Sequence, residues 1–439
     1  MNSYHSRSLC HAALRTAACA TLTLSLAAFP GGEPPTAGMP GAAGLALVAR
    51  KALVMPFEGP QVVDNAVVLV RDGRIEAVGP RSATQIPAGY EVRDLGARWV
   101  MPGMIDLHSH IGGTFDINDM VYLTNPELRV QASVVPDNPD LQRAIAGGVT
   151  TILYIPGSGT NSGGQGILMK TAPGKFEEIA VDVPGSLKVA QWGNPERWAI
   201  GVGKTIENYH LRTMFKRGLA YAEAWRDWEA GKGPKPEKDI QWELFRELAS
   251  QEVEISVHTQ VYQVVLMTIT MIKGEFGLNV FTDHSEIGGW AAAPVATQMK
   301  VPAIIGPRSI DTSRMGSWVG ALPTFDRVQG LAAGWQEGGQ PLIGFNTDAP
   351  VLPEEELSLQ SALGVRYGMQ IRNVDNVRGL TIVPAVVGGI SDRLGSLEPG
   401  KQADIVVLTG DPSDPRTAVD CVYVEGRVAY DAVHGTRRF

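Results

Sequence analysis

The feature that most constrains this chain is a series of short apolar runs that continues from Trp99 to Asp348. Longer stretches with helical patterning separate several of these runs, for example at 205–229 and 241–251. Strands that alternate with helices indicate a parallel sheet covered by helices. Eight runs is the number that a closed barrel needs, so the sequence predicts an α/β fold with a (β/α)8 TIM barrel over residues 99–396. The expected strands are WVMPGMIDLH, VTTILYIP, GILMKTA, SLKVAQ, VEISVHT, GLNVFTDHS, VPAIIGP and PLIGFNTD.

The two ends of the ordered chain carry a different pattern, of short strands joined by tight turns. Asp72-Gly73 separates two β-rich runs, which is a hairpin signal. The segment VEGRVAY near the C-terminus echoes RDGRIEAVG near the N-terminus. We therefore expect segments 45–98 and 397–435 to form one small composite β-sandwich domain, with the barrel inserted between them.

The first 29 residues are typical of a secretory signal peptide. Two arginines precede an apolar run over 17–29, and this segment contains no acidic residue. The run is about 13 residues long, shorter than the roughly 20 that a membrane span needs; an uncleaved anchor and a lipoprotein joined through Cys19 are the alternatives. We expect removal of residues 1–29, a flexible leader over 30–44, no stable membrane span in the mature chain, and a secreted or periplasmic location.

Composition excludes several classes of partner. Hydrophobic residues make up 44% of the chain and charged residues 19%, the balance of a globular protein with a large core. The net charge is −8 and no basic block occurs, which argues against nucleic acid and against an anionic membrane surface. After signal removal only Cys421 remains, so the mature chain cannot form an internal disulfide. We expect a small-molecule substrate, and homo-oligomerisation stays open.

Four histidines and one aspartate fall at the carboxyl ends of the expected barrel strands, where the active sites of such barrels form. The spacing His-x-His at the end of the first run directs both rings to one face, because side chains two apart in a strand point the same way. Imidazole and carboxylate together suit a divalent metal ion such as zinc. Each residue alone could be an ordinary core or loop residue, but ordinary packing does not explain all five. The set is His108, His110, His258, His284 and Asp348.

Five sequence segments together resemble the amidohydrolase superfamily. They are VMPGMIDLHSH, ISVHTQ, FTDHSE, FNTDAP and GSLEPGKQADIVVL, and the resemblance covers residues 45–432. Within the superfamily the chain is most similar to the branch of imidazolonepropionase-like enzymes and prolidase-like dipeptidases. The resemblance implies one or two divalent ions, zinc above all, and hydrolysis of amide, cyclic amide or dipeptide C–N bonds.

The resemblance also implies a role for each of these side chains. His108 and His110 would bind the more buried ion, and His258 and His284 would bind a second ion. In one-ion relatives His258 joins the first pair, and His284 contacts water or substrate. Asp348 would contact the metal ion and act as general base, taking a proton from the activated water and passing it to the departing nitrogen.

In two-ion relatives a carbamylated lysine on the fourth strand bridges both ions. Lys188 in PGSLKVAQW lies where the resemblance places that lysine. A lysine inside a short apolar run is costly to bury, which favours a functional role for it. A Lys188 that points outward between barrel and helix is the alternative, and Lys170 is a rival. Many relatives carry Glu just after this strand, where this chain has Gly193. The number of ions therefore stays open.

Three functions remain compatible with these residues. Hydrolysis of a C–N bond is the main expectation, deamination of an aminoheterocycle would use the same site, and an inactive binding protein is the non-enzymatic alternative. The Gly-rich stretch GSGTNSGGQG after the second strand is expected to be a loop, either simply flexible or a lid. If it contacts substrate, Asn161 and Gln165 are its candidate hydrogen-bonding groups.

Overall fold

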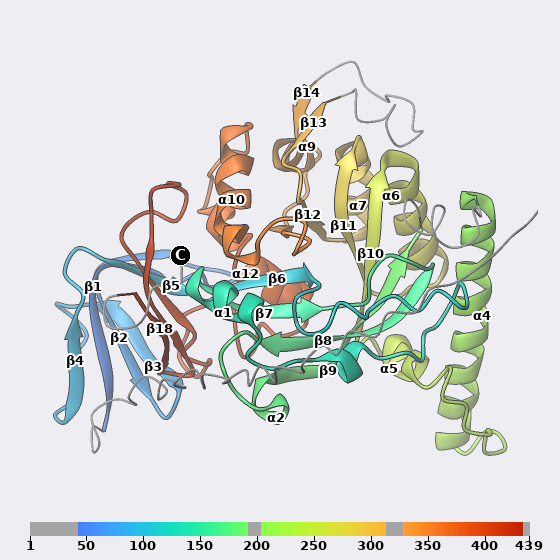
Figure 1. The fold of residues 1–439 in the computed structure, drawn as a ribbon, viewed down its shortest axis with the longest axis horizontal. Coiled ribbons are helices and arrows are strands. Elements are labelled where there is room, and N and C mark those ends of the chain that lie inside the picture. The colour runs from blue at the N-terminus through green and yellow to red at the C-terminus, as the bar shows by residue number, and fades with distance from the viewer. Residues whose placement is uncertain (1–42, 192–202, 313–327, 433–439) are drawn as a thin grey trace, which may run out of the picture. The chain divides into compact units, whose positions relative to one another are not determined.

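Two eight-stranded sheets carry most strands of the protein (Figure 1). The structure, a computed structural model, describes residues 43–191, 203–312 and 328–432. The predicted signal peptide, almost all of the predicted leader, and Gly193 lie outside the described residues. Within the described residues, no helix has the length and apolar character needed to cross a membrane.

The first sheet, here called the terminal sheet, draws its strands from both ends of the chain. Its strand order is β18-β17-β16-β5-β1-β2-β3, and β4 also pairs with β1. The prediction that segments from both ends of the chain build one β domain is confirmed. All of its strands belong to one hydrogen-bonded sheet. The strands are β1 (Gly44–Leu53), β2 (Val62–Arg71), β3 (Arg74–Pro80), β4 (Tyr90–Asp94), β5 (Trp99–Pro102), β16 (Ile405–Leu408), β17 (Val419–Val424) and β18 (Arg427–Asp431).

The predicted hairpin in the terminal sheet is confirmed. Arg71 pairs with Arg74 across β2 and β3, so Asp72 and Gly73 form a two-residue turn. Their φ angles are 50° and 76°, the left-handed conformation that a tight hairpin demands. Glycine adopts this conformation without strain and aspartate tolerates it, which is why the dipeptide predicts the turn.

The second sheet is the barrel, with the order β6-β7-β8-β9-β10-β11-β12-β15. The ring is nearly closed by a parallel bridge between Ser109, the last residue of β6, and Ala349, which follows β15. We call the carboxyl ends of its parallel strands the mouth and their amino ends the base. The strands are β6 (Met104–Ser109), β7 (Val149–Tyr154), β8 (Ser162–Lys170), β9 (Ala180–Ala190), β10 (Glu254–Val261), β11 (Val280–Ile287), β12 (Ala303–Ile305) and β15 (Ile343–Phe345).

One barrel strand runs against the others, so the expectation of a wholly parallel sheet was wrong. Strand β8 is antiparallel to both β7 and β9, with Thr151 at the start of β7 opposite Lys170 at the end of β8. The strand also begins at Ser162, so residues 162–166 of the expected Gly-rich loop are strand. An apolar run encodes burial but not direction, and the short connection from β7 turns back on itself instead of crossing over.

The run WVMPGMIDLH is divided between the two sheets. Trp99–Pro102 pairs with β1 and β16 in the terminal sheet, and the barrel strand begins at Met104, later than the boundary expected at residue 99. Gly103 separates the two parts. A Cβ atom there would lie 2.0 Å from Thr150 Oγ1, so only glycine lets the chain pass at this point.

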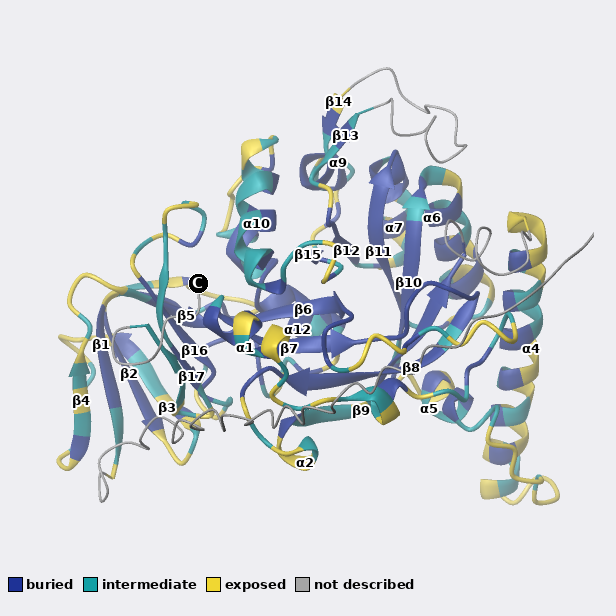
Figure 2. Ribbon diagram, in the orientation of Figure 1, coloured by how far each residue is buried: buried dark blue, intermediate teal, exposed yellow. Residues whose placement is uncertain are grey.

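Helices surround the barrel, and their outer faces are exposed while the strands are buried (Figure 2). The helix expected over 205–229 is confirmed as α4 and packs against α5, with the rings of Phe215 and Phe245 6.1 Å apart. The α-helices are α1 (Pro139–Ala146), α2 (Phe176–Ile179), α4 (Lys204–Glu229), α5 (Leu244–Ser250), α6 (Tyr262–Thr268), α7 (Ala293–Met299), α9 (Leu331–Glu337), α10 (Leu357–Arg366), α11 (Asp375–Arg378) and α12 (Ile382–Val387). Short turns of other helix types are η1 (Val130–Ser133), η2 (Ile269–Glu275), η3 (Gly289–Ala292) and η4 (Glu354–Glu356), and β13 (Ile310–Thr312) pairs with β14 (Val328–Gly330) as a separate hairpin.

Candidate metal centre

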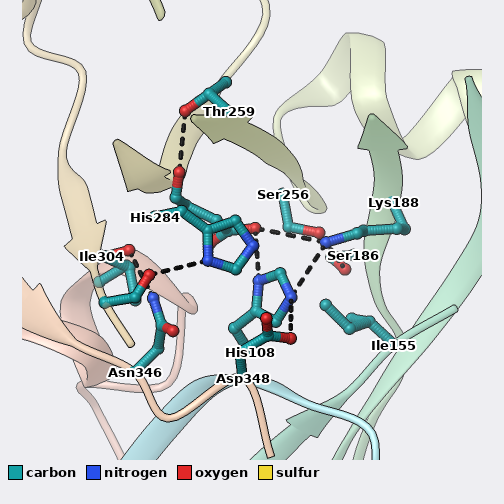
Figure 3. A network of polar contacts seen from close by, with 12 residues as sticks. His108, Ile155, Ser186, Lys188, Ser256, Thr259, His284, Ile304, Asn346 and Asp348 are labelled. Carbon is teal, nitrogen blue, oxygen red and sulfur yellow. Dashed lines mark hydrogen bonds and ion pairs between the residues drawn. The ribbon is translucent and has the colours of Figure 1, made fainter. Parts of the chain in front are cut away.

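Three side chains from the two outermost barrel strands meet at the mouth. Nε2 of His108 and Nε2 of His110 each lie 3.3 Å from Oδ1 of Asp348. One ligand atom from each residue fits within 4.8 Å of the others, close enough to hold one metal ion. The histidines come from the end of β6, and Asp348 follows β15, so the near-closure of the barrel brings them together. Figure 3 shows His108 and Asp348 in this arrangement.

A buried carboxylate, Asp106, fixes the relative positions of these two strand ends. Its Oδ1 accepts a hydrogen bond from the backbone N–H of His108 at 2.8 Å. Its Oδ2 accepts two more, from the backbone N–H and the hydroxyl of Thr347, each at 2.8 Å. Burial raises the pKa of Asp106 to about 6, although these hydrogen bonds act to lower it. Asp106 therefore links the residue before Asp348 to the first histidine.

His108 lies between acidic and basic partners. Its Nδ1 is 2.9 Å from Oδ2 of Asp283, and its Nε2 is 3.4 Å from Nζ of Lys188. The same Lys188 nitrogen lies 3.6 Å from Asp283. A carboxylate at Nδ1 orients the ring and leaves Nε2 facing Asp348, the usual arrangement of an outer carboxylate behind a metal-binding histidine.

Burial shapes the protonation of this group. Burial lowers the pKa of Lys188, although Asp283 and Asp348 act to raise it. Burial acts to raise the pKa of Asp348, but hydrogen bonds from His108 and His110 outweigh it and hold that pKa well below its usual range. Asp348 is therefore ionised at neutral pH. Its side chain is 19% exposed, so the carboxylate can be reached from the mouth.

His258 and His284 complete the cluster and leave ring nitrogens without partners. The rings of His258 and His284 lie 4.5 Å apart, and those of His284 and His108 lie 4.4 Å apart. His284 Nδ1 contacts the carbonyl oxygen of Gly306 at 2.8 Å, but its Nε2 and both nitrogens of His258 are buried and have no hydrogen-bond partner among the residues that the structure describes. Burial lowers the pKa of His284 to about 3 and that of His258 well below its usual value, so both rings are neutral.

The donor set fits a divalent cation. Neutral imidazoles and an ionised carboxylate are the protonation states that bind metal ions. Buried nitrogens without partners are costly, and a bound cation is one way to satisfy them. His108, His110 and Asp348 could hold one ion, with His258 and His284 beside them.

Two of the candidate residues have an uncommon backbone conformation. His284 has φ 62° and Asp348 has φ 51°, a region that residues other than glycine rarely occupy. Strained positions of this kind concentrate at functional sites, where the surrounding structure maintains them.

The structure separates the two candidate lysines. Lys188 is fully buried on β9 at the cluster, so the alternative that it points out between barrel and helix is wrong. Lys170 lies at the base because β8 runs antiparallel, and it forms an ion pair with Asp404. Lys170 is therefore excluded from the cluster as the rival lysine.

Asn161 and Gln165 use their side-chain amides to bind the backbone. Asn161 donates to the carbonyl oxygen of Ala190 at 2.7 Å, and Gln165 donates to that of Pro126 at 3.0 Å. Both are buried. These contacts brace the segments next to β8 and β9, and a substrate-binding role for the two residues stays a prediction.

Sequence reasoning missed Asp283 and Asp106. Asp283 directly precedes His284, and neighbouring side chains in a regular strand point to opposite faces. The positive φ of His284 breaks this alternation, so both residues reach His108. For Asp106 a signal was available: it lies two residues before His108, in the same His-x-His motif region and on the same face.

Comparisons with known proteins agree with this geometry. The sequence profile of the amidohydrolase family matches residues 330–429. The chain is 28% identical to an amidohydrolase from Thermotoga maritima whose crystal structure superimposes with a TM-score of 0.76, covering 88% of this chain and 100% of that one. These matches support an assignment of the chain to the amidohydrolase superfamily. The amidohydrolase and imidazolonepropionase relatives support a hydrolase as the class of enzyme.

Two further amidohydrolase relatives differ in how much of their length the chain spans. Imidazolonepropionase from Deinococcus radiodurans is 24% identical over 82% of this chain and 91% of its own length. Amidohydrolase tasK from Hapsidospora irregularis is 25% identical over 83% of this chain, but the match covers only 40% of tasK. The chain thus spans less than half of the length of tasK.

Proposed function

We propose that this amidohydrolase is a metal-dependent enzyme that hydrolyses a C–N bond in a small amide, cyclic amide or dipeptide. The observation that carries the proposal is the convergence of His108, His110 and Asp348 within 4.8 Å, beside the unpartnered ring nitrogens of His258 and His284. Neither a core nor a surface loop needs this concentration of imidazole around one carboxylate. Zinc is the ion that we propose, because nitrogen-rich sites with one carboxylate suit it.

Bound at this centre, a divalent ion would supply a water molecule that loses its proton near neutral pH and would polarise the scissile carbonyl. Asp348 is placed to accept that proton, because it is ionised and its carboxylate is partly accessible. The protonated Asp348 would then deliver the proton to the departing nitrogen, so that the amine leaves neutral. His284, held by the Gly306 carbonyl oxygen, would orient the water or the substrate carbonyl.

The number of ions depends on Lys188. Its amine faces Nε2 of His108 at 3.4 Å and would repel a second cation if it were protonated. A carbamate on Lys188 would reverse this, because it adds a negative charge and two oxygen ligands next to His258 and His284. We propose one ion for the unmodified lysine and two for the carbamate. A metal count combined with electron density at Lys188 tests this: one ion beside a bare lysine would exclude the second site.

The proposed function is tested by turnover of a substrate panel by metal-reconstituted protein. The panel contains N-acyl amino acids, dipeptides, cyclic amides and aminoheterocycles. Release of an amine or amino acid from at least one amide supports the proposal. Release of free ammonia from a heterocycle, with no amide cleaved, would identify a deaminase instead. Stoichiometric metal with no turnover across the panel would identify a binding protein.

We also propose that the chain is exported to the periplasm or the medium after removal of residues 1–29. The charge and apolar pattern of that segment supports the proposal. N-terminal sequencing of protein recovered from each cell fraction tests it. An intact Met1 on cytoplasmic protein would contradict it.

A further inference from the structure

A second charged pair lies at the mouth, next to the metal centre. Glu286 follows His284 by two residues, and its side chain is fully buried. Nη1 of Arg308 lies 2.6 Å from Glu286 Oε2, and the backbone N–H of Arg308 donates to Oε1 at 3.2 Å. The Arg308 side chain, in contrast, is 42% exposed. The pair therefore has a buried acidic end and an accessible basic end.

Arg308 belongs to the segment that borders the cluster. It follows β12, which lies in the sheet between β11, the strand of His284, and β15, the strand that leads to Asp348. Two residues earlier in this segment, the carbonyl oxygen of Gly306 contacts Nδ1 of His284 at 2.8 Å. The segment of Arg308 thus lies between the strand that carries His284 and the strand that leads to Asp348.

The same segment is anchored on both sides of Arg308. Ser309 accepts a backbone hydrogen bond from Leu331 at 3.0 Å, and its hydroxyl donates to Gln360 at 3.1 Å. Asp311 accepts hydrogen bonds from the backbone of Gly288 at 2.8 Å and from the ring N–H of Trp290 at 3.0 Å. Arg308 therefore projects from a fixed backbone, and its remaining freedom is that of its own side chain.

The pair leaves most of the donors of Arg308 available. A guanidinium has five N–H donors in a planar fork, and Glu286 occupies only Nη1. Among the residues that the structure describes, the guanidinium of Arg308 forms a hydrogen bond or ion pair with no side chain other than Glu286. Burying Glu286 behind it costs desolvation energy, which a purely structural role would avoid with an apolar residue. A fixed, accessible guanidinium is suited to bidentate binding of a carboxylate.

We propose that Arg308, positioned by Glu286, binds a carboxylate of the substrate and so selects acidic amides, such as N-acyl amino acids or dipeptides, over neutral ones. This inference rests on the proposed function, because it assigns the substrate class of the same mouth. Arg308 is then a binding residue, and Glu286 is the residue that positions it.

The test compares matched substrate pairs. Each pair joins an N-acyl amino acid or dipeptide with the amide of the same amine lacking only the carboxylate. We expect the wild-type kcat/KM to be at least about tenfold higher for the acidic compound than for the neutral one. Arg308→Met should lower kcat/KM for the acidic compound about a hundredfold and change kcat/KM for the neutral compound less than about twofold. Arg308→Lys should recover part of the selectivity, because it keeps the charge but not the planar fork.

Two further variants separate binding from folding. Arg308→Met leaves Glu286 buried without its cation, so Arg308→Met/Glu286→Gln removes that charge as well and should show the same loss of selectivity. Arg212→Met is the matched control, because Arg212 is 43% exposed and paired with Glu275 on the outside of the barrel. An equal loss on both members of a pair would overturn the proposal and leave Arg308 as a structural partner of Glu286.

Calorimetric titration of metal-free protein with the acidic and the neutral compound of each pair measures binding without catalysis. Tighter binding of the acidic member by wild type, abolished in Arg308→Met, supports the proposal even where nothing is hydrolysed. Equal binding of both members by wild type overturns it, whether or not C–N hydrolysis is observed. Absence of hydrolysis from every pair would instead contradict the proposed function.

Discussion

Two buried lysines on neighbouring barrel strands have opposite surroundings. Lys170, at the end of β8, lies at the base and is paired with Asp404 from the segment that leads into the terminal sheet. Lys188, on β9, lies at the mouth, 3.4 Å from a histidine nitrogen and 3.6 Å from Asp283. Both are almost completely inaccessible to solvent. Residue type and burial are the same, and only the end of the barrel differs.

This difference shows that the direction of a strand decides at which end of the barrel a buried lysine lies, and therefore which partners surround it. The base pairs its lysine with one close carboxylate, and Oδ1 of Asp404 is also occupied by the backbone N–H of Glu425 at 3.0 Å. The mouth instead places Lys188 beside His108 and near His258 and His284, which have three ring nitrogens without hydrogen-bond partners among the described residues. We infer that the base uses its charge for stability and that the mouth keeps its charges available for a ligand.

The largest expected effect is on stability, at the base. Lys170→Met should lower the free energy of unfolding by about 3–5 kcal/mol, because it leaves Asp404 buried without a cation. Urea unfolding of metal-free protein measures this. Lys170→Met/Asp404→Asn should recover most of the loss, since asparagine can still accept from Glu425. If Lys170→Met were as stable as wild type, the ion pair of Lys170 would not stabilise the fold, and the proposed difference between the two lysines would be wrong.

The next effect is on turnover, at the mouth. Asp348→Asn should lower kcat at least about a hundredfold, which corresponds to about 2.7 kcal/mol, because asparagine cannot accept the proton. A metal count should show that most of the metal is kept, and the unfolding midpoint should change little. Asp182→Asn is the control and should turn over normally, because Asp182 is a half-buried aspartate paired with Arg393. Near wild-type turnover by Asp348→Asn would remove its role as general base.

A third effect depends on pH and concerns the base again. Burial raises the pKa of Glu254 to about 7, although a hydrogen bond from Asn279 and the charge of Lys273 act to lower it. Between pH 4.5 and 7 the folded state therefore binds more protons than the unfolded state, and stability falls as the pH rises through this window. Glu254→Gln removes this dependence, so it should be about 2 kcal/mol more stable than wild type at pH 8 and about equal to it at pH 4. Thermal unfolding at the two pH values measures the difference, and parallel shifts at both would contradict it.

The smallest effect is expected for the lysine at the mouth. Lys188→Met should change the unfolding free energy of metal-free protein by less than about 1 kcal/mol, because the cost of burying the amine offsets its attraction to Asp283. The same urea titration as for Lys170→Met gives a direct comparison. A loss as large as that of Lys170→Met would show that Lys188 is a structural charge as well.

Most barrel strands could be predicted, because apolar runs in the sequence indicate which segments are buried. The eight apolar runs all became strands of one sheet in chain order, apart from the first four residues of WVMPGMIDLH. The reversal of β8 could not be predicted, because an antiparallel strand and a parallel strand need the same apolar pattern. That reversal alone places Lys170 at the base.

The candidate site also contains residues that the sequence predicted and residues that only the structure revealed. His108, His110 and Asp348 were selected by residue type and position at strand ends, and the structure brings their ligand atoms together. Asp283 was missed because the φ of 62° at His284 overrides the alternation of the strand. Arg308 and Glu286 belong to different strand ends, and their contact depends on the neighbouring positions of β11 and β12 in the sheet.

The sequence by itself determined which segments are buried, which residues are candidates to bind a metal ion, and which superfamily the chain resembles. Those properties depend on side-chain chemistry and local pattern, which every residue carries with it. Only the tertiary structure decided which lysine lies at the mouth, which carboxylate supports His108, and where the accessible guanidinium emerges. Those outcomes depend on strand direction and on contacts between distant segments, which local pattern does not encode.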